Sequence, residues 1–292
     1  MKKINKLCLS ASILFLVSSC NVESDFETNP TSNADLSKHE IAFPDAKGVV
    51  KTGFLNGQEI SYEVINGYNV YQGDIILTDS QIKSSPDNYA AKTVALNNRR
   101  WSNNTVYYTV NRKLSNTRRV YDAIAHWEAY TNITFIEFNP KKGKRSNNPT
   151  NYIEFVPGFG CSSNVGMIGG KQTITLASGC STGNAIHEIA HAVGVFHEHS
   201  RADRDNHIVI HYENISSGVE SNFERAVDRG YNASDYTSEL DFGSVMMYPS
   251  NAFSSNGLPT ITKLDGSTFS SQRNGLSPSD IQGINLMYPA SN

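Results

Sequence analysis

Residues 184–205, NAIHEIAHAVGVFHEHSRADRD, contain side chains whose types and spacing suit metal chemistry. In a helix, His187 and His191 lie four residues apart on one face, with Glu188 next to them. Two imidazoles and a carboxylate can therefore converge on one point. This favours a zinc site over the alternative, a surface helix with scattered histidines.

The residues that follow can bring a third imidazole to the same point. Gly194 can adopt the left-handed backbone conformation that ends a helix, so the chain can turn back and bring His197 into reach. Three nitrogens at about 2.0 to 2.1 Å leave a tetrahedral zinc ion one position for water, which is typical of a catalytic site. The sequence thus predicts one catalytic Zn²⁺ bound by His187, His191 and His197.

The rest of the chain predicts the elements that must position these side chains. Runs of β-branched and aromatic residues with the length of strands occur at 105–110, 133–138, 152–156 and 173–177. Residues 115–130 carry apolar side chains at helical spacing, which predicts a helix over a sheet. Near the C-terminus, Ser277 is suited to cap a helix that begins at Pro278, with Asp280 as the acid of a capping box.

These motifs resemble those of the metzincin metallopeptidases and, within them, the astacin family. Residues 197–205, HEHSRADRD, match the family pattern HEHxRxDRD, and residues 241–248, DFGSVMMY, are similar to its DFGSIMHY, with Met247 where the family usually has His. The resemblance extends from about Trp101 to the C-terminal helix. It implies an α+β fold: a two-subdomain catalytic domain in which a twisted mixed sheet carries the active-site helix above an irregular C-terminal subdomain that ends in a helix.

The resemblance also implies roles for single residues. Met246 would be the Met-turn residue beneath the zinc, and Tyr248 would ligate zinc at rest and swing to stabilise the transition state. Glu198 would pair with the mature N-terminus, and Arg273 would favour acidic side chains in the pocket after the scissile bond. From residue type alone, Met246 would be a core residue, Tyr248 a core or turn residue, Glu198 an exposed acid and Arg273 a structural arginine.

In the implied mechanism, zinc-activated water attacks the peptide carbonyl with Glu188 as general base. Glu188 would then pass the proton to the leaving amine. Zinc-activated water makes a serine or cysteine nucleophile unnecessary, so we expect no covalent intermediate. The products of this chemistry would be peptides, and the substrates proteins or peptides.

Two of the four cysteines, Cys161 and Cys180, lie in the body of the chain. In an exported protein one remaining pair most simply forms a disulfide, and the resemblance implies the same pairing. The alternative is two unrelated buried thiols. The second disulfide common in the family would join positions matched here by Asn132 and about Ala290, so we expect packing alone to hold the C-terminal helix.

Residues 1–20 have the cationic start and short apolar run of a signal peptide. The run ends in Val17-Ser18-Ser19-Cys20, which resembles a bacterial lipobox and predicts lipidation of Cys20. The alternative is an ordinary secretory signal that ends near a cysteine. We expect an exported protein whose precursor is anchored to a bacterial membrane through this lipid.

Residues 21–90 are expected to form a tether and an inhibitory pro-segment, and residues 91–292 the catalytic domain. The YQGD sequence at 71–74 is similar to the FxGD motif of astacin precursors, which implies that Asp74 blocks the zinc; the alternative is a Gly-Asp turn. Cleavage by an activating protease is expected within residues 88–93, which intact-mass analysis of the active enzyme would test.

The 25 Lys and Arg residues and 28 Asp and Glu residues give a formal net charge of -3, which argues against nucleic-acid binding.

The metal motif, the leader and the YQGD sequence together predict a secreted, monomeric zinc endopeptidase made as a latent zymogen. The alternative is a lipid-anchored surface binding protein with a non-catalytic metal site. Glu188 beside a complete set of histidine ligands favours the enzyme.

Overall fold

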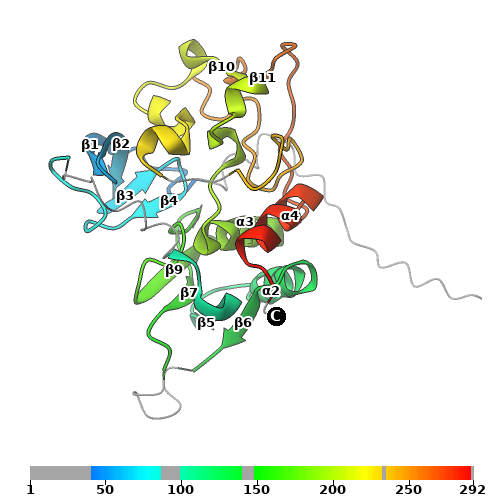
Figure 1. Cartoon of the computed structure of the whole chain (residues 1–292). Helices are drawn as coiled ribbons and strands as arrows, with labels where there is room; N and C mark the ends of the chain where they lie inside the picture. The colour runs from blue at the N-terminus through cyan, green and yellow to red at the C-terminus, as the bar shows by residue number, and fades with distance from the viewer. Residues whose placement is uncertain (1–40, 87–98, 140–147, 232–234, 291–292) are drawn as a thin grey trace, which may run out of the picture. The chain divides into compact units, whose positions relative to one another are not determined.

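The computed structural model describes residues 41–86, 99–139, 148–231 and 235–290 (Figure 1). The expected signal peptide with Cys20, most of the expected tether and the expected cleavage window at 88–93 lie outside these ranges. In the described part of the chain, no helix has both the length and the apolar character needed to cross a bilayer.

A five-stranded mixed sheet organises the N-terminal part of the expected catalytic domain. Its strands are β5 (Thr105–Val110), β6 (Thr134–Glu137), β7 (Tyr152–Val156), β8 (Cys161–Ser162) and β9 (Lys171–Leu176), in the order β6-β5-β7-β9-β8. The first four strands in this order run parallel, and β8 pairs antiparallel with β9 at the edge. The four strands expected from the sequence are therefore present within two residues of the predicted ends.

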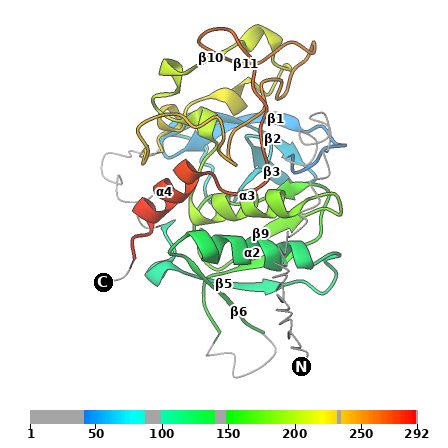
Figure 2. The same ribbon diagram turned by 90° about the vertical axis from the view of Figure 1, so that its right-hand side faces the viewer.

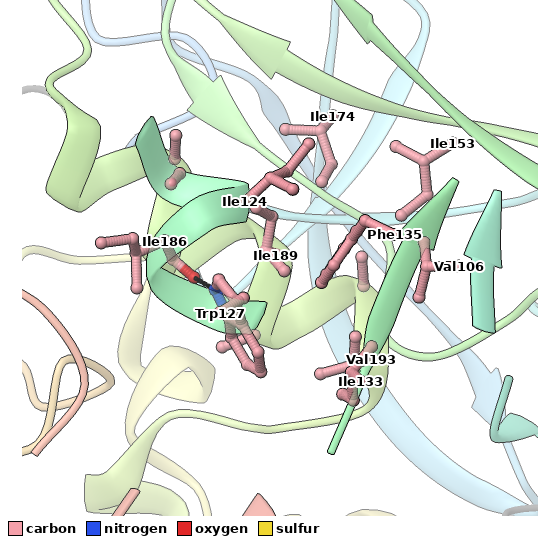
Figure 3. Close-up of a cluster of buried hydrophobic side chains, with 14 of the residues drawn as sticks. Val106, Ile124, Trp127, Ile133, Phe135, Ile153, Ile174, Ile186, Ile189 and Val193 are labelled. Carbon is pink, nitrogen blue, oxygen red and sulfur yellow. Dashed lines mark hydrogen bonds between the residues drawn. The ribbon is translucent and has the colours of Figure 1, made fainter. Parts of the chain in front are cut away.

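Two helices, α2 (Arg118–Tyr130) and α3 (Thr182–Val193), pack against each other along this sheet (Figure 2). Trp127 of α2 is fully buried, and its indole Nε1 donates a hydrogen bond to the carbonyl of Ile186 on α3 at 3.3 Å (Figure 3). Apolar side chains of both helices and of the sheet form one cluster around it. Burial of this cluster fixes α3, which carries the HExxH motif, against the sheet.

Residues 49–77 form a second, antiparallel sheet from the expected pro-segment. Its strands are β1 (Val49–Leu55), β2 (Gln58–Ile65), β3 (Tyr68–Tyr71) and β4 (Ile75–Leu77), paired in sequence order. Asn-Gly turns at 56–57 and 66–67 join the first three strands, and all four turn residues have positive φ, as tight hairpins require. Apolar side chains of this sheet pack in one cluster with Val165, Ala226 and Tyr231 of the expected catalytic domain.

The C-terminal part of the chain is largely irregular, as expected. It contains the two-stranded sheet β10 (Ile208–Ile210) and β11 (Ile261–Lys263), and the helix α4 (Pro278–Met287). Its short 3₁₀ helices are η4 (Glu198–Ser200), η5 (Arg204–Asn206), η6 (Tyr212–Asn214), η7 (Glu220–Phe223) and η8 (Ala226–Arg229); a further one, η2 (Ser102–Asn104), directly precedes β5. The fold is α+β, with a mixed sheet, an active-site helix and a C-terminal helix.

The C-terminal helix begins as predicted. The Ser277 hydroxyl accepts a hydrogen bond from the Asp280 backbone N–H, and the Asp280 carboxylate accepts one from the Ser277 N–H, each at 2.9 Å. The expectation that packing alone holds this helix is wrong. The side-chain amide of Asn132 donates to the carbonyl of Tyr288 at 3.0 Å, and its backbone N–H donates to Asn285 Oδ1 at 2.9 Å. Hydrogen bonds from Asn132 thus tie α4 to the segment that follows α2.

Cys161 and Cys180 form the predicted disulfide, which joins β8 to the segment before α3. Because the bond closes a loop with a sequence separation of 19 residues, it reduces the entropy of the unfolded chain. We expect the Cys161→Ala/Cys180→Ala double variant to lose about 2 to 5 kcal/mol of unfolding free energy. Urea denaturation with and without reductant would measure this. Equal denaturation midpoints for the native protein and the double variant would contradict this prediction.

Candidate active site

Helix α3 positions two of the histidines because both of its ends are well defined. Ser181 caps the N-terminus by accepting a hydrogen bond from the Asn184 backbone N–H at 3.1 Å. At the other end Gly194 has φ 111, a left-handed conformation that costs glycine little. The chain therefore turns back after α3, and His197 comes next to the two histidines of the helix, as the sequence predicts.

The three imidazoles and one carboxylate meet at a single buried point. The donor atoms of Asp74, His187, His191 and His197 all lie within 4.8 Å of one another, and all four side chains are buried. Oδ2 of Asp74 lies 3.1 Å from Nε2 of His187 and 3.2 Å from Nε2 of His197, and Oδ1 lies 3.6 Å from Nε2 of His191. Ligand bonds of about 2.0 to 2.1 Å to a tetrahedral zinc imply donors about 3.3 to 3.4 Å apart. The distances from Asp74 to the three imidazoles are therefore close to those that zinc requires.

The outer ring nitrogens support the same interpretation. Nδ1 of His187 lies 2.8 Å from the carbonyl oxygen of Val245, and Nδ1 of His191 lies 2.8 Å from that of Val195. Because a carbonyl oxygen only accepts, each of these nitrogens carries the ring proton. Each Nε2 is then unprotonated and faces the centre of the cluster, which is the tautomer that a metal requires.

Burial keeps His187 and His197 neutral. It lowers the pKa of His187 to about 4 and that of His197 to about 3. Neutral imidazoles are the protonation state that binds a metal ion at neutral pH. Nε2 of His191 and Oδ1 of Asp74 are buried without a hydrogen bond, so the lone pairs of both atoms are available to a cation.

Asp74 reaches the cluster from the turn between β3 and β4. Gln72 and Gly73 both have positive φ, 48 and 79, which turns the carboxylate of Asp74 inward. The chain after Asp74 pairs with the segment that follows β8: the Ser163 N–H donates to the carbonyl of Asp74 at 3.0 Å, and the Ile76 N–H donates to the carbonyl of Ser163 at 2.8 Å. The segment that contains Asp74, which is the expected pro-segment, therefore lies along the edge of the five-stranded sheet.

Glu188 is fully buried and lies next to His187 in α3, outside the set of four donors. Met246 is also buried, and its carbonyl accepts a hydrogen bond from the Glu198 backbone N–H at 2.9 Å. The segment around Met246 thus contacts two points of the metal site: His187 through Val245, and the residue that follows His197. The catalytic role of Glu188 and the Met-turn role of Met246 stay predictions.

Tyr248 lies beside the third ligand. Its ring stacks on His199, with centroids 4.0 Å apart, and its ring centroid lies 4.5 Å from that of His197. Its hydroxyl donates a hydrogen bond to the backbone carbonyl of Gln72 at 2.6 Å. The tyrosine is therefore near the metal site but turned toward the pro-segment.

Glu198 borders a cavity of about 160 Å³, whose lining also includes Gly194, Arg201, Asp241 and Asp280. Burial raises the pKa of Glu198 to about 7, and its carboxylate accepts a hydrogen bond from the Asp241 backbone N–H at 2.9 Å. The expectation from residue type alone, an exposed acid, is therefore wrong. The cavity leaves room beside Glu198 for an additional charged group.

Arg273 is buried next to the start of α3. Its guanidinium donates to the carbonyls of Gln272 at 2.5 Å and Met247 at 3.4 Å, and a side chain at Gly183 would collide with the Arg273 carbonyl. The structure therefore places Arg273 close to the metal site. Its contribution to substrate preference stays a prediction.

The contacts of three residues were not anticipated from the sequence. Gln72 contacts His197 and Tyr248, Ser163 pairs with the pro-segment, and His199 stacks on Tyr248. His199 belongs to the HEHxRxDRD pattern, which could have suggested a role for it. Nothing in the spacing of Gln72 or Ser163 indicates these partners, because they come from distant segments.

Comparisons with known proteins agree with this site. A sequence model of the Astacin peptidase family matches residues 93–289, and the chain belongs to this family. Zinc metalloproteinase nas-13 of Caenorhabditis elegans is 40% identical over 193 residues, which cover 65% of this chain and 41% of that protein. Flavastacin of Elizabethkingia meningoseptica is 32% identical over 313 residues, covering 97% of this chain and 63% of flavastacin. The chain thus spans less than two thirds of the length of both relatives.

Among solved structures, the hatching enzyme zinc-protease HCE-1 of the medaka fish Oryzias latipes is similar. The superposition has a TM-score of 0.57 at 28% identity and covers 66% of this chain and 94% of HCE-1. The α+β fold and the buried cluster of Asp74 and three histidines are therefore those of an astacin domain with its zinc site.

Proposed function

We propose that this protein is a zinc-dependent endopeptidase made as a latent precursor. The observation that carries the proposal is the buried cluster in which three histidines of the astacin domain meet Asp74 of an upstream segment. A purely structural site would have no use for a general base, yet Glu188 stands beside the ligands. Proteins or peptides are the substrate class that the family implies.

His187, His191 and His197 would hold the zinc ion, which polarises a peptide carbonyl and activates water when it is bound. Glu188 would accept the proton of the attacking water and return it to the leaving amine. The Tyr248 hydroxyl, once released from Gln72, would donate a hydrogen bond to the oxygen that gains charge in the transition state.

Latency would follow from three contacts of the pro-segment. Asp74 takes the position that substrate or water needs, and Gln72 holds the Tyr248 hydroxyl away from the site. Pairing of the pro-segment with Ser163 covers the backbone groups through which a peptide could add to the sheet edge. Each contact must be released before the enzyme can act.

The domain boundaries form part of the proposal: residues 1–20 a signal peptide, 21–90 a tether with the pro-segment, and 91–292 the catalytic domain. A new N-terminal ammonium produced near residue 91 would fit the cavity beside the Glu198 carboxylate. If Cys20 carries a lipid, the same cut would free the enzyme from the membrane. Active mature enzyme in a washed membrane fraction would contradict this release.

Removal of the metal tests the function directly. We expect the processed chain to cleave a denatured protein, to lose this activity in a zinc chelator, and to regain it when Zn²⁺ is restored. Gel analysis of the substrate and intact mass of the enzyme would follow the reaction. Tight zinc binding without any cleavage would instead favour a surface binding protein with a non-catalytic metal site.

A further inference from the structure

The three zinc-binding histidines differ in what holds their outer ring nitrogens. Val245 and Val195 provide main-chain carbonyls for His187 and His191, and both belong to the astacin domain. Nδ1 of His197 instead lies 3.1 Å from Oε1 of Gln72, in the pro-segment. One of the three partners is therefore lost when the pro-segment leaves.

The chemistry of a metal-bound imidazole assigns the direction of this hydrogen bond. With Nε2 directed at the metal, Nδ1 of a neutral histidine carries the proton and needs an acceptor. The side-chain oxygen of Gln72, not its NH₂ group, must then face His197. Such partners orient the ring and increase its basicity, and their loss typically weakens metal binding about 10- to 100-fold.

The backbone at Gln72 is unusual for a residue that only fills a turn. It has φ 48, a conformation in which Gly or Asn is preferred, and it is almost fully buried. Its carbonyl accepts the hydroxyl of Tyr248 at 2.6 Å, and its side chain reaches His197. Gln72 thus contacts both the third ligand, His197, and the tyrosine that lies beside it.

We propose that Gln72 is a positioning residue of the metal site, and that the pro-segment holds zinc in the precursor as well as blocking it. The side-chain oxygen of Gln72 fixes the ring of His197, so the precursor releases zinc more slowly than the processed chain. This inference rests on the proposed function, in which residues 71–74 occupy the metal site. It gives the pro-segment a second task, which is to retain the metal until cleavage.

The test measures the rate of zinc transfer from the full-length precursor to a chromogenic chelator, in a Glu188→Ala background that prevents self-cleavage. Gln72→Met keeps the length of the side chain but removes the acceptor, and we expect zinc release to become about 10- to 100-fold faster. Gln72→Glu restores an acceptor and should release zinc no faster than Gln72. Gln58→Met makes the same change at an exposed position of β2 and serves as the matched control.

A release rate of Gln72→Met within twofold of the control would overturn the inference. Gln72→Asn, which tolerates positive φ but is one methylene shorter, decides the question in the same way if Gln72→Met does not fold. Asp74→Asn separates the two proposals. If it accelerates zinc release and Gln72→Met does not, the role of Gln72 fails alone. If Asp74→Asn leaves zinc release unchanged in this background, and the uncut precursor with native Glu188 stays latent when it carries Asp74→Asn, the proposed occupation of the metal site by Asp74 fails.

Discussion

The processed Glu188→Ala variant is expected to lose peptidase activity by a factor of about 10² to 10⁴ while it keeps its zinc. Glu188 lies outside the four donors, so its removal leaves the three histidines in place. Without this carboxylate, no buried side chain beside His187 in α3 is suited to accept the proton of the attacking water. Measurements of kcat/KM on a peptide and of zinc content by mass spectrometry would check both parts.

Two further variants sharpen this experiment. Glu188→Gln keeps the shape of the side chain without its basicity and should be as inactive as Glu188→Ala. Glu239→Ala removes an exposed carboxylate of the same domain and should keep native activity. Loss of zinc together with activity in both Glu188 variants would mean that Glu188 maintains the site rather than acting as a base.

The uncut precursor with Asp74→Ala should hydrolyse a small peptide at least about tenfold faster than the native precursor, a change equivalent to about 1.4 kcal/mol. Asp74 supplies the fourth donor of the metal site, and alanine leaves that position open to water. A small peptide is the right substrate because the chain after Asp74 still covers Ser163. Initial rates would be measured while intact mass shows that the precursor is uncut.

Asp45→Ala, at an exposed position of the same pro-segment, is the matched control and should stay as latent as the native precursor. Equal rates for the Asp74→Ala and native precursors would show that latency does not depend on this carboxylate. Equal activation by both substitutions would point to a general loosening of the pro-segment.

The features that could be predicted from the sequence depend on neighbours in the chain. His187 and His191 share a helix face because the helical repeat places them there, and Gly194 ends α3 because glycine adopts positive φ at little cost. The capping box of Ser277 and Asp280 is likewise local. The cysteine count predicted the Cys161–Cys180 disulfide. Motif resemblance added Asp74, which lies 113 and 123 residues away from His187 and His197.

The pairings between distant segments could not be derived in this way. Asn132 meets α4, Ser163 meets the pro-segment, and the carboxylate of Glu198 is buried beside a cavity. Gln72 reaches His197 over 125 residues of chain. Residue type and spacing thus determine which groups can bind zinc and which helix presents them. Packing decides whether a fourth ligand atom joins the three histidines and which groups bind their outer ring nitrogens. Burial of apolar side chains brings distant segments together, but neither segment carries a local sequence pattern that indicates the contact.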